Sequence, residues 1–360
     1  MRIIVDIAHP AHVHFFKNFI WLMEEKGHEI IITAGDKEVT LKLLENYGFK
    51  YHFTCKRTHG YKLMLEVVKR DIQMLRFVKE YKPDMVIGIA STIASHVSKV
   101  TKVKSIVFTD TEHTKLADTI TYPFSDCIVT PSCYLKDLGE KQIRYNGYHE
   151  LAYLHPNRFT PNPAVLTEIG LAEGDPFIIV RFVSWQASHD VGQHGIRDKV
   201  GLVKALEEYG RVLITSEGGL PPELQSYQIR VSPEKLHDLL YYATLYVGEG
   251  GTTASEAAVL GTHAIIVSTL SKHCGIRTDL NQYDLLWISE DDEYTIDKAA
   301  ELLQNADLKA LGQYNRSRLI DEKIDVTAFM VWLIENYPEN VGMVKANSDF
   351  ANIFRSERSL

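Results

Sequence analysis

Short apolar runs alternate with segments of helical periodicity over the first 150 residues. The runs are rich in Ile and Val, which favours β-strands, and they span Ile3–Ile7, Glu29–Thr33, Met85–Ile89, Lys104–Phe108 and Asp126–Thr130. Between them, His12 to Lys26 and Lys37 to Tyr47 repeat apolar positions at the helical spacing. This alternation is typical of βαβ units, so we expect a parallel sheet covered by helices.

A linker separates this first series from a second one. The periodicity lapses near residues 145–163, where Pro156, Pro161 and Pro163 mark a break. The strands predicted after it are Phe177–Val183, Arg211–Thr215, Gln228–Val231, Leu245–Val247, Ala264–Val267 and Leu286–Ile288. The helices predicted between them lie at about Gly195–Tyr209, Pro233–Ala243, Thr253–Leu260 and Ile296–Gln304.

The chain is therefore predicted to be an α/β protein of two Rossmann-like domains with parallel sheets. Residues 1–155 form the first domain, residues 156–337 form the second, and residues 338–360 form a polar tail. A helix near Val326–Glu335 is a candidate to cross back onto the first domain. Two such domains would face each other across a cleft at the carboxyl ends of both sheets, where ligands of α/β proteins bind.

Composition narrows the class of protein. The chain is 45% hydrophobic and 24% charged, as soluble globular proteins are, and no apolar run reaches the roughly 18 residues of a membrane span. A strand pattern begins at Arg2 in place of a signal peptide. The four cysteines are scattered without a CxxC pair, as expected for reduced thiols rather than disulfides or a zinc site. We therefore expect a cytoplasmic location.

Charge is distributed unevenly along the chain. The first 155 residues hold 21 Lys and Arg against 18 Asp and Glu, whereas the remainder holds 18 against 29. This acidic remainder argues against nucleic acid as a partner. Residues 56–82 hold eight basic and three acidic residues among apolar ones. They are predicted to form a helix packed on the core; the alternative is a peripheral contact with the inner face of a membrane.

A glycine-rich turn follows the apolar run that ends at Val247. Gly250 and Gly251 permit a tight turn and close approach of the backbone to a ligand. A helix predicted after them offers unpaired N–H groups and a positive dipole end, so Thr252 and Thr253 join the candidate phosphate-binding residues. The alternative is an ordinary capping box from Thr253 to Glu256.

Other polar residues of the second domain also follow predicted strands. Arg181 is placed to pair with a phosphate, or to pack its stem along the sheet. Lys272 and His273 come after the strand that follows the glycine turn. We expect these two cationic or titratable side chains to flank a diphosphate held at that turn.

Histidines and carboxylates follow two strands of the first domain. His9, His12 and His14 occupy the first β–α loop, and Asp110 and Glu112 follow a later strand. No local carboxylate or cysteine completes a metal site with the histidines, so we expect general acid–base chemistry by His9 or His12. Burial beside His12 would raise the pKa of one carboxylate. The alternatives are that the imidazoles bond to backbone or water and that Asp110 caps a helix.

Three motifs resemble a family known as domain of unknown function 354. They are Asp6–Phe16, Phe108–Glu112 and Gly248–Thr252. The resemblance extends over nearly the full length and implies a GT-B fold, the two-Rossmann architecture of many nucleotide-sugar enzymes. A GT-B fold hosts both sugar transferases and sugar-nucleotide 2-epimerases, so the fold alone does not choose between these reactions.

The glycine turn also resembles the nucleotide-sugar loop of the peptidoglycan enzymes that transfer N-acetylglucosamine to a lipid-linked acceptor. That resemblance implies that Glu256 holds the ribose hydroxyls and that His12 matches a loop histidine. The glycine-rich run that precedes this histidine in those enzymes is replaced here by His9, Pro10 and Ala11. Their acceptor contacts are therefore not carried over to this chain.

Together these features predict a glycosyltransferase with a nucleotide-sugar donor, a UDP-sugar, in surface polysaccharide or glycoconjugate synthesis. The second domain would bind the donor, and His12 or Asp110 would take the proton from a hydroxyl of a sugar or lipid-linked acceptor. The helix dipole and nearby cations would neutralise the leaving diphosphate. Neither a metal nor a cofactor is therefore expected.

Two other functions remain open from the sequence. A UDP-N-acetylglucosamine 2-epimerase would need acid and base groups on both faces of the sugar, for which Asp110, Glu112, His189 and Glu217 are candidates. A non-catalytic nucleotide-sugar-binding protein would bind the nucleotide without turning it over.

Overall fold

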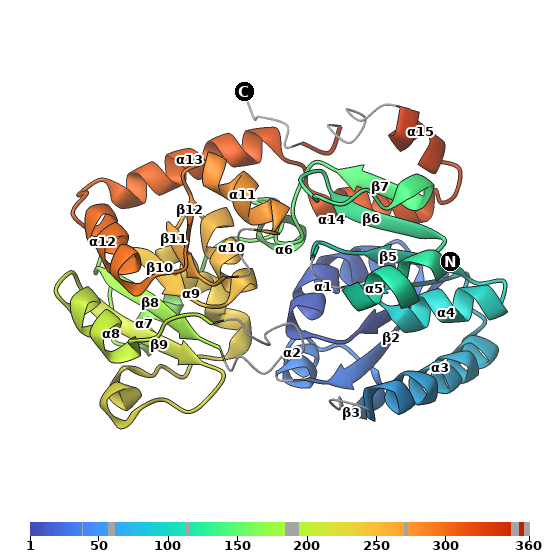
Figure 1. The fold of residues 1–360 in the computed structure, drawn as a ribbon. Helices are drawn as coiled ribbons and strands as arrows, with labels where there is room; N and C mark the ends of the chain where they lie inside the picture. Colours follow the sequence, from blue (N-terminus) through green and yellow to red (C-terminus); the bar gives the residue numbers. More distant parts are fainter. Residues whose placement is uncertain are drawn as a thin grey trace. The chain divides into compact units, whose positions relative to one another are not determined.

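The chain folds into two compact units (Figure 1). A computed structural model describes residues 1–37, 39–56, 62–112, 115–183, 194–269, 273–346 and 353–355. The first unit comprises Met1–Arg158 together with Lys323–Leu360, and the second comprises Phe159–Glu322. The second unit is therefore inserted into the sequence of the first.

The first unit is built on a seven-stranded sheet whose neighbouring strands are all parallel. Its strands are β1 (Arg2–Ile7), β2 (Glu29–Asp36), β3 (His52–Lys56), β4 (Met85–Ile89), β5 (Lys104–Phe108), β6 (Cys127–Pro131) and β7 (Gln142–Tyr145). Their order across the sheet is β3-β2-β1-β4-β5-β6-β7. The order reverses between β1 and β4, and such a switch point is where open α/β sheets bind ligands.

Helices connect these strands as βαβ units require. They are α1 (Pro10–Glu25), α2 (Thr40–Asn46), α3 (Lys62–Tyr81), α4 (Thr92–Val100) and α5 (Lys115–Ile120), and α6 (Leu151–Leu154) follows the last strand, β7. Helix α1 begins at Pro10, whose missing N–H would have had no partner in the first turn. It ends just before Gly27, which has a φ of 83°. Phe15, Phe16 and Phe19 of α1 are fully buried and anchor it on the sheet.

The second unit carries a five-stranded parallel sheet of order β12-β11-β10-β8-β9. Its strands are β8 (Phe177–Phe182), β9 (Arg211–Ser216), β10 (Leu245–Gly248), β11 (Ala264–Val267) and β12 (Leu286–Ser289). Its helices are α7 (Ala164–Glu168), α8 (Lys199–Glu207), α9 (Leu236–Tyr242), α10 (Gly251–Val259), α11 (Gly275–Gln282), α12 (Asp292–Leu303) and α13 (Leu308–Glu322). The predicted α/β class with two Rossmann-like parallel sheets is confirmed.

The C-terminal part of the chain returns to the first unit. Helices α14 (Val326–Glu335) and α15 (Val341–Ala346) belong to it. Helix α14 lies beside β7 (Figure 1), and the rings of Phe329 and Tyr145 pack there with centroids 5.6 Å apart. At its end, Glu335 forms a 2.8 Å ion pair with Lys26, just after α1.

An ion pair joins the points where the chain leaves and re-enters the first unit. Arg158 Nη2 lies 2.8 Å from Asp325 Oδ2. The same carboxylate caps α14 by accepting the N–H of Ala328 at 3.1 Å. The sequence assigned residues 156–337 to the second domain, whereas the packing places residues 323–337 in the first unit.

The predicted strand at Gln228–Val231 is wrong. Gln228 makes only an isolated bridge to Ile214, because a 3-10 helix at Pro222–Tyr227 and a second proline at Pro233 bracket the segment. The pattern also missed β3 and β7. These are the two edge strands of their sheet, and they are short and partly polar. Edge strands need less apolar sequence than central ones, so their pattern is weak.

Candidate functional site

The glycine turn connects β10 to α10 at the carboxyl edge of the second sheet. Gly248 ends the strand, where an added Cβ would lie 2.8 Å from the carbonyl oxygen of Arg181. Gly250 is the N-cap of α10 and makes no side-chain cap hydrogen bond. The alternative capping box is therefore wrong, since Thr253 lies inside the helix. The first turn of α10 leaves its N–H groups available to a ligand.

Two arginines pack directly on the glycines of this turn. An added Cβ at Gly251 would overlap the guanidinium of Arg277, whose Cζ lies only 2.8 Å from that position. One at Gly250 would lie 3.3 Å from Nε of Arg181. The glycines thus allow both guanidiniums to approach the N-terminus of a nine-residue helix. Two fixed positive charges there add to the helix dipole and favour an anion.

Arg181 and Arg277 come from different elements. Arg181 is on β8, and its Nη2 lies 2.9 Å from Oε1 of Glu217, just beyond β9. The Glu217 carboxylate therefore orients Arg181 across the carboxyl edge. Arg277 is on α11, and the sequence analysis missed it because no local motif surrounds it. Only the fold brings α11 to the turn.

Glu256 is buried in the middle of α10. Its Oε1 lies 3.0 Å from Nε2 of His237 on α9, and both side chains are at most 5% exposed. This pair connects α9 to α10. The role of Glu256 in holding ribose hydroxyls remains a prediction.

The remaining candidates of the second unit have varied surroundings. Thr252 is exposed in the first turn of α10, whereas Thr253 is buried. His273 is exposed just before α11. Lys272 lies outside the described residues, as does His189. Of these candidates, Thr252 is the one that the structure places directly beside the glycine turn.

Glu249 is a further residue of the turn that the sequence analysis did not identify. It is buried, and its two carboxylate oxygens accept the backbone N–H groups of Val183 at 2.8 Å and Ile196 at 2.9 Å. These bonds satisfy the buried charge. They also hold Val183, just after β8, and Ile196 against the glycine turn. Its position between Gly248 and Gly250 was the available signal.

His9 and His12 bond to the backbone at the carboxyl end of β1. His9 is the N-cap of α1, and its Nδ1 accepts the N–H of Ala11 at 3.1 Å. His12 Nδ1 accepts the N–H of Ala8 at 3.3 Å. Because each Nδ1 accepts, the proton of a neutral ring sits on Nε2. The two ring centroids are 5.9 Å apart, so the histidines form one cluster.

Asp110 pairs with a histidine that the sequence analysis missed. Its Oδ2 lies 3.1 Å from Nδ1 of His149, and its Oδ1 accepts the hydroxyl of Thr111 at 2.9 Å. Burial acts to raise the pKa of Asp110, but the charge and hydrogen bond of His149, the Thr111 hydroxyl and the charge of His12 together lower it to about 2. The expectation of a raised pKa is wrong for this carboxylate. Asp110 is therefore a weak base that orients an imidazole.

His149 and Glu112 show why sequence position alone was insufficient. His149 lies in the aperiodic stretch predicted as a linker, yet it is buried and its ring centroid is 4.4 Å from that of Phe15. Glu112 is also buried, and its Oε1 accepts the N–H of Leu135 at 3.2 Å. Glu112 therefore helps to hold the segment after β6.

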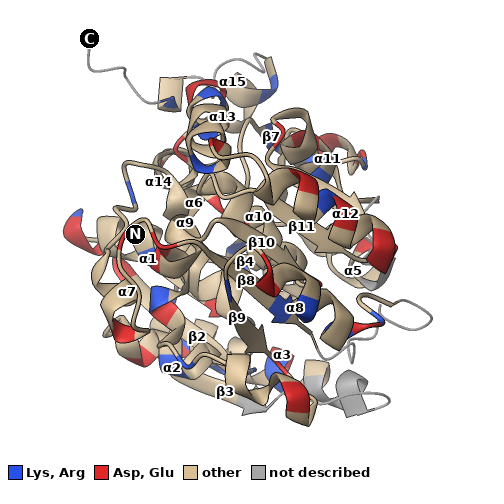
Figure 2. Ribbon diagram, turned by 90° about the vertical axis from the view of Figure 1, so that its left-hand side faces the viewer, with Lys and Arg blue, Asp and Glu red and all other residues tan. Residues whose placement is uncertain are grey.

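Helix α3 carries its apolar face on the core, as the first interpretation predicted. Met74 and Val78 are buried against β1 and β4 residues. On the other face, Val68 and Ile72 are exposed among charged residues of both signs (Figure 2). In the described part of the chain, every helix is too short or too polar to cross a membrane.

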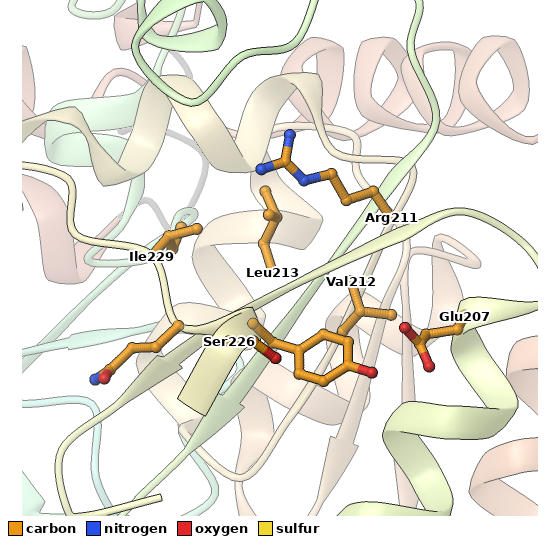
Figure 3. Close-up of a pocket in the computed structure, with 8 residues that line it drawn as sticks. Glu207, Arg211, Val212, Leu213, Ser226 and Ile229 are labelled. Atoms are coloured by element: carbon orange, nitrogen blue, oxygen red, sulfur yellow. The ribbon is translucent and has the colours of Figure 1, made fainter. Parts of the chain in front are cut away.

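A shallow cavity of about 360 Å³ lies at the opposite end of β9 (Figure 3). Its lining comes from α8, β9 and the segment after Pro222, and comprises Glu207, Arg211, Val212, Leu213, Ser226, Tyr227, Gln228 and Ile229. Arg211 begins β9, so the cavity is beside the amino end of this edge strand. It is distinct from the carboxyl-edge cluster around the glycine turn.

Comparison with known proteins identifies one matching family model and a distant relative. The model, described as "Protein of unknown function (DUF354)", matches residues 1–337. The relative is uncharacterized protein MJ0665 of Methanocaldococcus jannaschii, which is 25% identical over 273 residues. That match covers 71% of this chain and 79% of the relative.

Solved structures with similar folds include two kinds of sugar enzyme. UDP-GlcNAc 2-epimerase from Neisseria meningitidis, bound to UDP-GlcNAc, is 10% identical with a TM-score of 0.66. Spinosyn rhamnosyltransferase SpnG, complexed with spinosyn aglycone, is 14% identical with a TM-score of 0.62. Each match covers 93% of this chain and 100% of the other chain. The predicted GT-B-type fold is confirmed.

Proposed function

The chain belongs to the DUF354 family of proteins of unknown function, and we propose that it is a glycosyltransferase that uses a nucleotide-diphosphate sugar, a UDP-sugar, as donor. One observation carries this proposal. Gly250 and Gly251 bring the guanidiniums of Arg181 and Arg277 onto the N-terminus of α10. A diphosphate matches both features, since it can accept backbone N–H groups and bind two guanidiniums.

The same groups would promote departure of the diphosphate. Negative charge grows on the bridging oxygen as the bond to the sugar breaks. Backbone N–H groups and fixed guanidiniums at that position stabilise this charge more in the transition state than in the ground state. This stabilisation makes the transfer independent of a metal or cofactor in our proposal.

The first unit would supply the acceptor side. Its carboxyl edge holds His9, His12 and the Asp110–His149 pair. Imidazoles can take a proton from an acceptor hydroxyl near neutral pH. A sugar or lipid-linked acceptor and a role in surface polysaccharide or glycoconjugate synthesis remain part of the proposal.

The similar structures include a rhamnosyltransferase and a 2-epimerase, and so they support either a transferase or a 2-epimerase. An epimerase would need free acid and base groups, but three of its four candidates are engaged, and the fourth, His189, lies outside the described residues. Asp110 is paired with His149, Glu112 accepts the N–H of Leu135, and Glu217 binds Arg181. These contacts favour the transferase.

A ligand screen tests the proposal. The full chain is heated with UDP, UDP-GlcNAc, and GDP, TDP and CMP sugars, and a donor that binds the folded state raises Tm. We expect the largest rise with a UDP-sugar and its loss in R277A. The control is R211A, an arginine at the amino end of β9. No rise with any sugar nucleotide would overturn the proposal.

A second assay separates the two reactions. The chain is incubated with UDP-GlcNAc without an acceptor, and the sugar is followed by proton NMR. We expect no conversion to the manno epimer. Conversion would replace the transferase by the epimerase, and tight binding without turnover in any acceptor pool would favour a non-catalytic protein.

A further inference from the structure

Two carboxylate–histidine pairs of the first unit differ at their outer nitrogen. His96 Nδ1 lies 2.9 Å from Asp71 Oδ2, and its Nε2 lies 2.9 Å from the carbonyl oxygen of Ile120. His149 Nδ1 is bonded to Asp110, but its Nε2 is buried and has no hydrogen-bond partner among the described residues. Both ring nitrogens of His96 are thus bonded within the protein. In the second pair, Nε2 of His149 remains to bond to another group.

A second buried polar atom belongs to a side chain that interacts with Asp110. The hydroxyl of Tyr145, at the end of β7, is fully buried and has no hydrogen-bond partner in the described part of the chain. Burial raises the pKa of this hydroxyl well above its usual value, and the charges of Asp110 and Glu150 add to the effect. Tyr145 therefore remains a neutral donor that interacts electrostatically with Asp110.

Native structures seldom leave buried polar atoms unpaired, and a catalytic role is one explanation for those that remain. Here two of them, one imidazole nitrogen and one hydroxyl, belong to side chains that each interact with the Asp110 carboxylate. Asp110 accepts from Nδ1–H of His149, so the lone pair of a neutral ring is on Nε2. This is the arrangement in which a carboxylate orients an imidazole as a base.

We infer that His149 Nε2 takes the proton from the acceptor hydroxyl, that Asp110 positions its ring, and that Tyr145 donates a hydrogen bond to the same acceptor. The inference rests on the proposed transferase function. The acceptor O–H bond breaks and its proton moves to Nε2. The acceptor oxygen bonds to the anomeric carbon, and the diphosphate leaves with the electron pair of the broken C–O bond.

Several charged or titratable groups face this cluster from neighbouring elements. His12 on α1 acts on Asp110, and Glu150 and Cys133 act on Tyr145. The test therefore uses changes that keep charge and shape nearly constant. The variants are H149Q and D110N, and the matched control is H96Q, which changes the histidine whose two nitrogens are both bonded.

The test uses the sugar nucleotide that raises Tm most in the thermal-shift screen. It measures release of the nucleoside diphosphate from this donor, with water in place of the acceptor. We expect H149Q to lower kcat about 100- to 10,000-fold with little change in the donor KM, as loss of a general base does. H96Q should stay within about threefold of the unchanged chain. Equal kcat in H149Q and the unchanged chain would overturn the inference while leaving the proposed function standing.

Nitrogen-15 NMR of the imidazole rings gives a readout that does not need turnover. We expect the neutral ring of His149 to carry its proton on Nδ1, and D110N to shift that proton. A protonated Nε2 in the neutral ring would overturn the inference. If no sugar nucleotide binds, the proposed function is wrong, and the inferred role of His149 as a base is wrong as well.

Discussion

The two sheets present different chemistry at equivalent edges. The carboxyl edge of the second sheet brings together the glycine turn, Arg181 and Arg277, which suit an anion. The carboxyl edge of the first brings together His12, Asp110 and His149, which suit proton transfer. Both sheets are parallel and both reverse their strand order beside a central strand. The strand arrangement thus sets the place of the chemistry, whereas the loop residues set its kind.

The largest expected effect concerns Asp6, a carboxylate of the first sheet that we assign a structural role, in contrast to Asp110. Asp6 is 2% exposed and is held by Arg70 at 3.3 Å, Ser91 at 2.7 Å and Thr33 at 3.1 Å. R70M would leave a buried charge without its cation and should lower the free energy of unfolding by about 3–5 kcal/mol. Urea denaturation measures this loss.

The control for this prediction is K69M, at an exposed neighbouring position of α3. It should change the unfolding free energy by no more than about 0.5 kcal/mol. If R70M and K69M were equally stable, the ion pair of Asp6 and Arg70 would not be structural. Asp6 would then be grouped with Asp110 and His149, the residues of that edge that suit proton transfer.

The next effect concerns the anion side of the comparison. Removal of the Arg277 guanidinium should weaken UDP binding about ten- to one hundredfold, because a charge-assisted hydrogen bond contributes about 1.5–3 kcal/mol. Isothermal titration of R277A measures the change in Kd. The matched variant H149Q should bind UDP as the unchanged chain does. An equal loss of UDP affinity in R277A and H149Q would contradict the assignment of anion binding to the second sheet and of proton transfer to the first.

A third prediction uses the lowered pKa of Asp110. Because this pKa falls from 3.8 to about 2 on folding, the carboxylate stabilises the fold above pH 4 and loses that contribution as pH falls toward 2. The full contribution is about 2 kcal/mol, of which roughly half is lost by pH 3. Between pH 6 and pH 3, D110N should therefore lose about 1 kcal/mol less stability than the unchanged chain.

Urea titrations at the two pH values check this difference. The control E140Q alters an exposed carboxylate of the same unit and should follow the unchanged chain. Parallel acid sensitivity of D110N and the unchanged chain would mean that the His149 pair does not stabilise the folded state.

The smallest expected effect on stability is that of G251A. The added methyl would displace the guanidinium of Arg277, the flexible end of a side chain, and alanine is itself favoured in a helix. The free energy of unfolding should change by less than about 1 kcal/mol, while UDP binding weakens as in R277A. A large loss of stability with unchanged UDP affinity would contradict the proposed role of the glycine.

The sequence predicted those features that depend on residues close together along the chain. Strand β1, the start of α1 and the glycine turn each depend on neighbouring residues, and their patterns were sufficient. Arg277 and His149 were missed because their roles depend on contacts with residues that are 26 and 39 positions away, Gly251 and Asp110. Such contacts arise from strand order, which apolar periodicity does not encode. The short edge strands β3 and β7 were missed for a related reason, since an edge position relaxes the need for apolar residues.

The ion pair of Arg158 and Asp325 has a consequence for how this chain can be divided. Excision of Phe159–Glu322 would leave two chain ends that the ion pair of Arg158 and Asp325 already holds together. A short glycine–serine linker could therefore join them. Truncation after Glu322, in contrast, would strip α14 from its partners on α1 and β7. The second unit is thus an insertion that can be removed from the first, and the first unit depends on residues that follow the insertion.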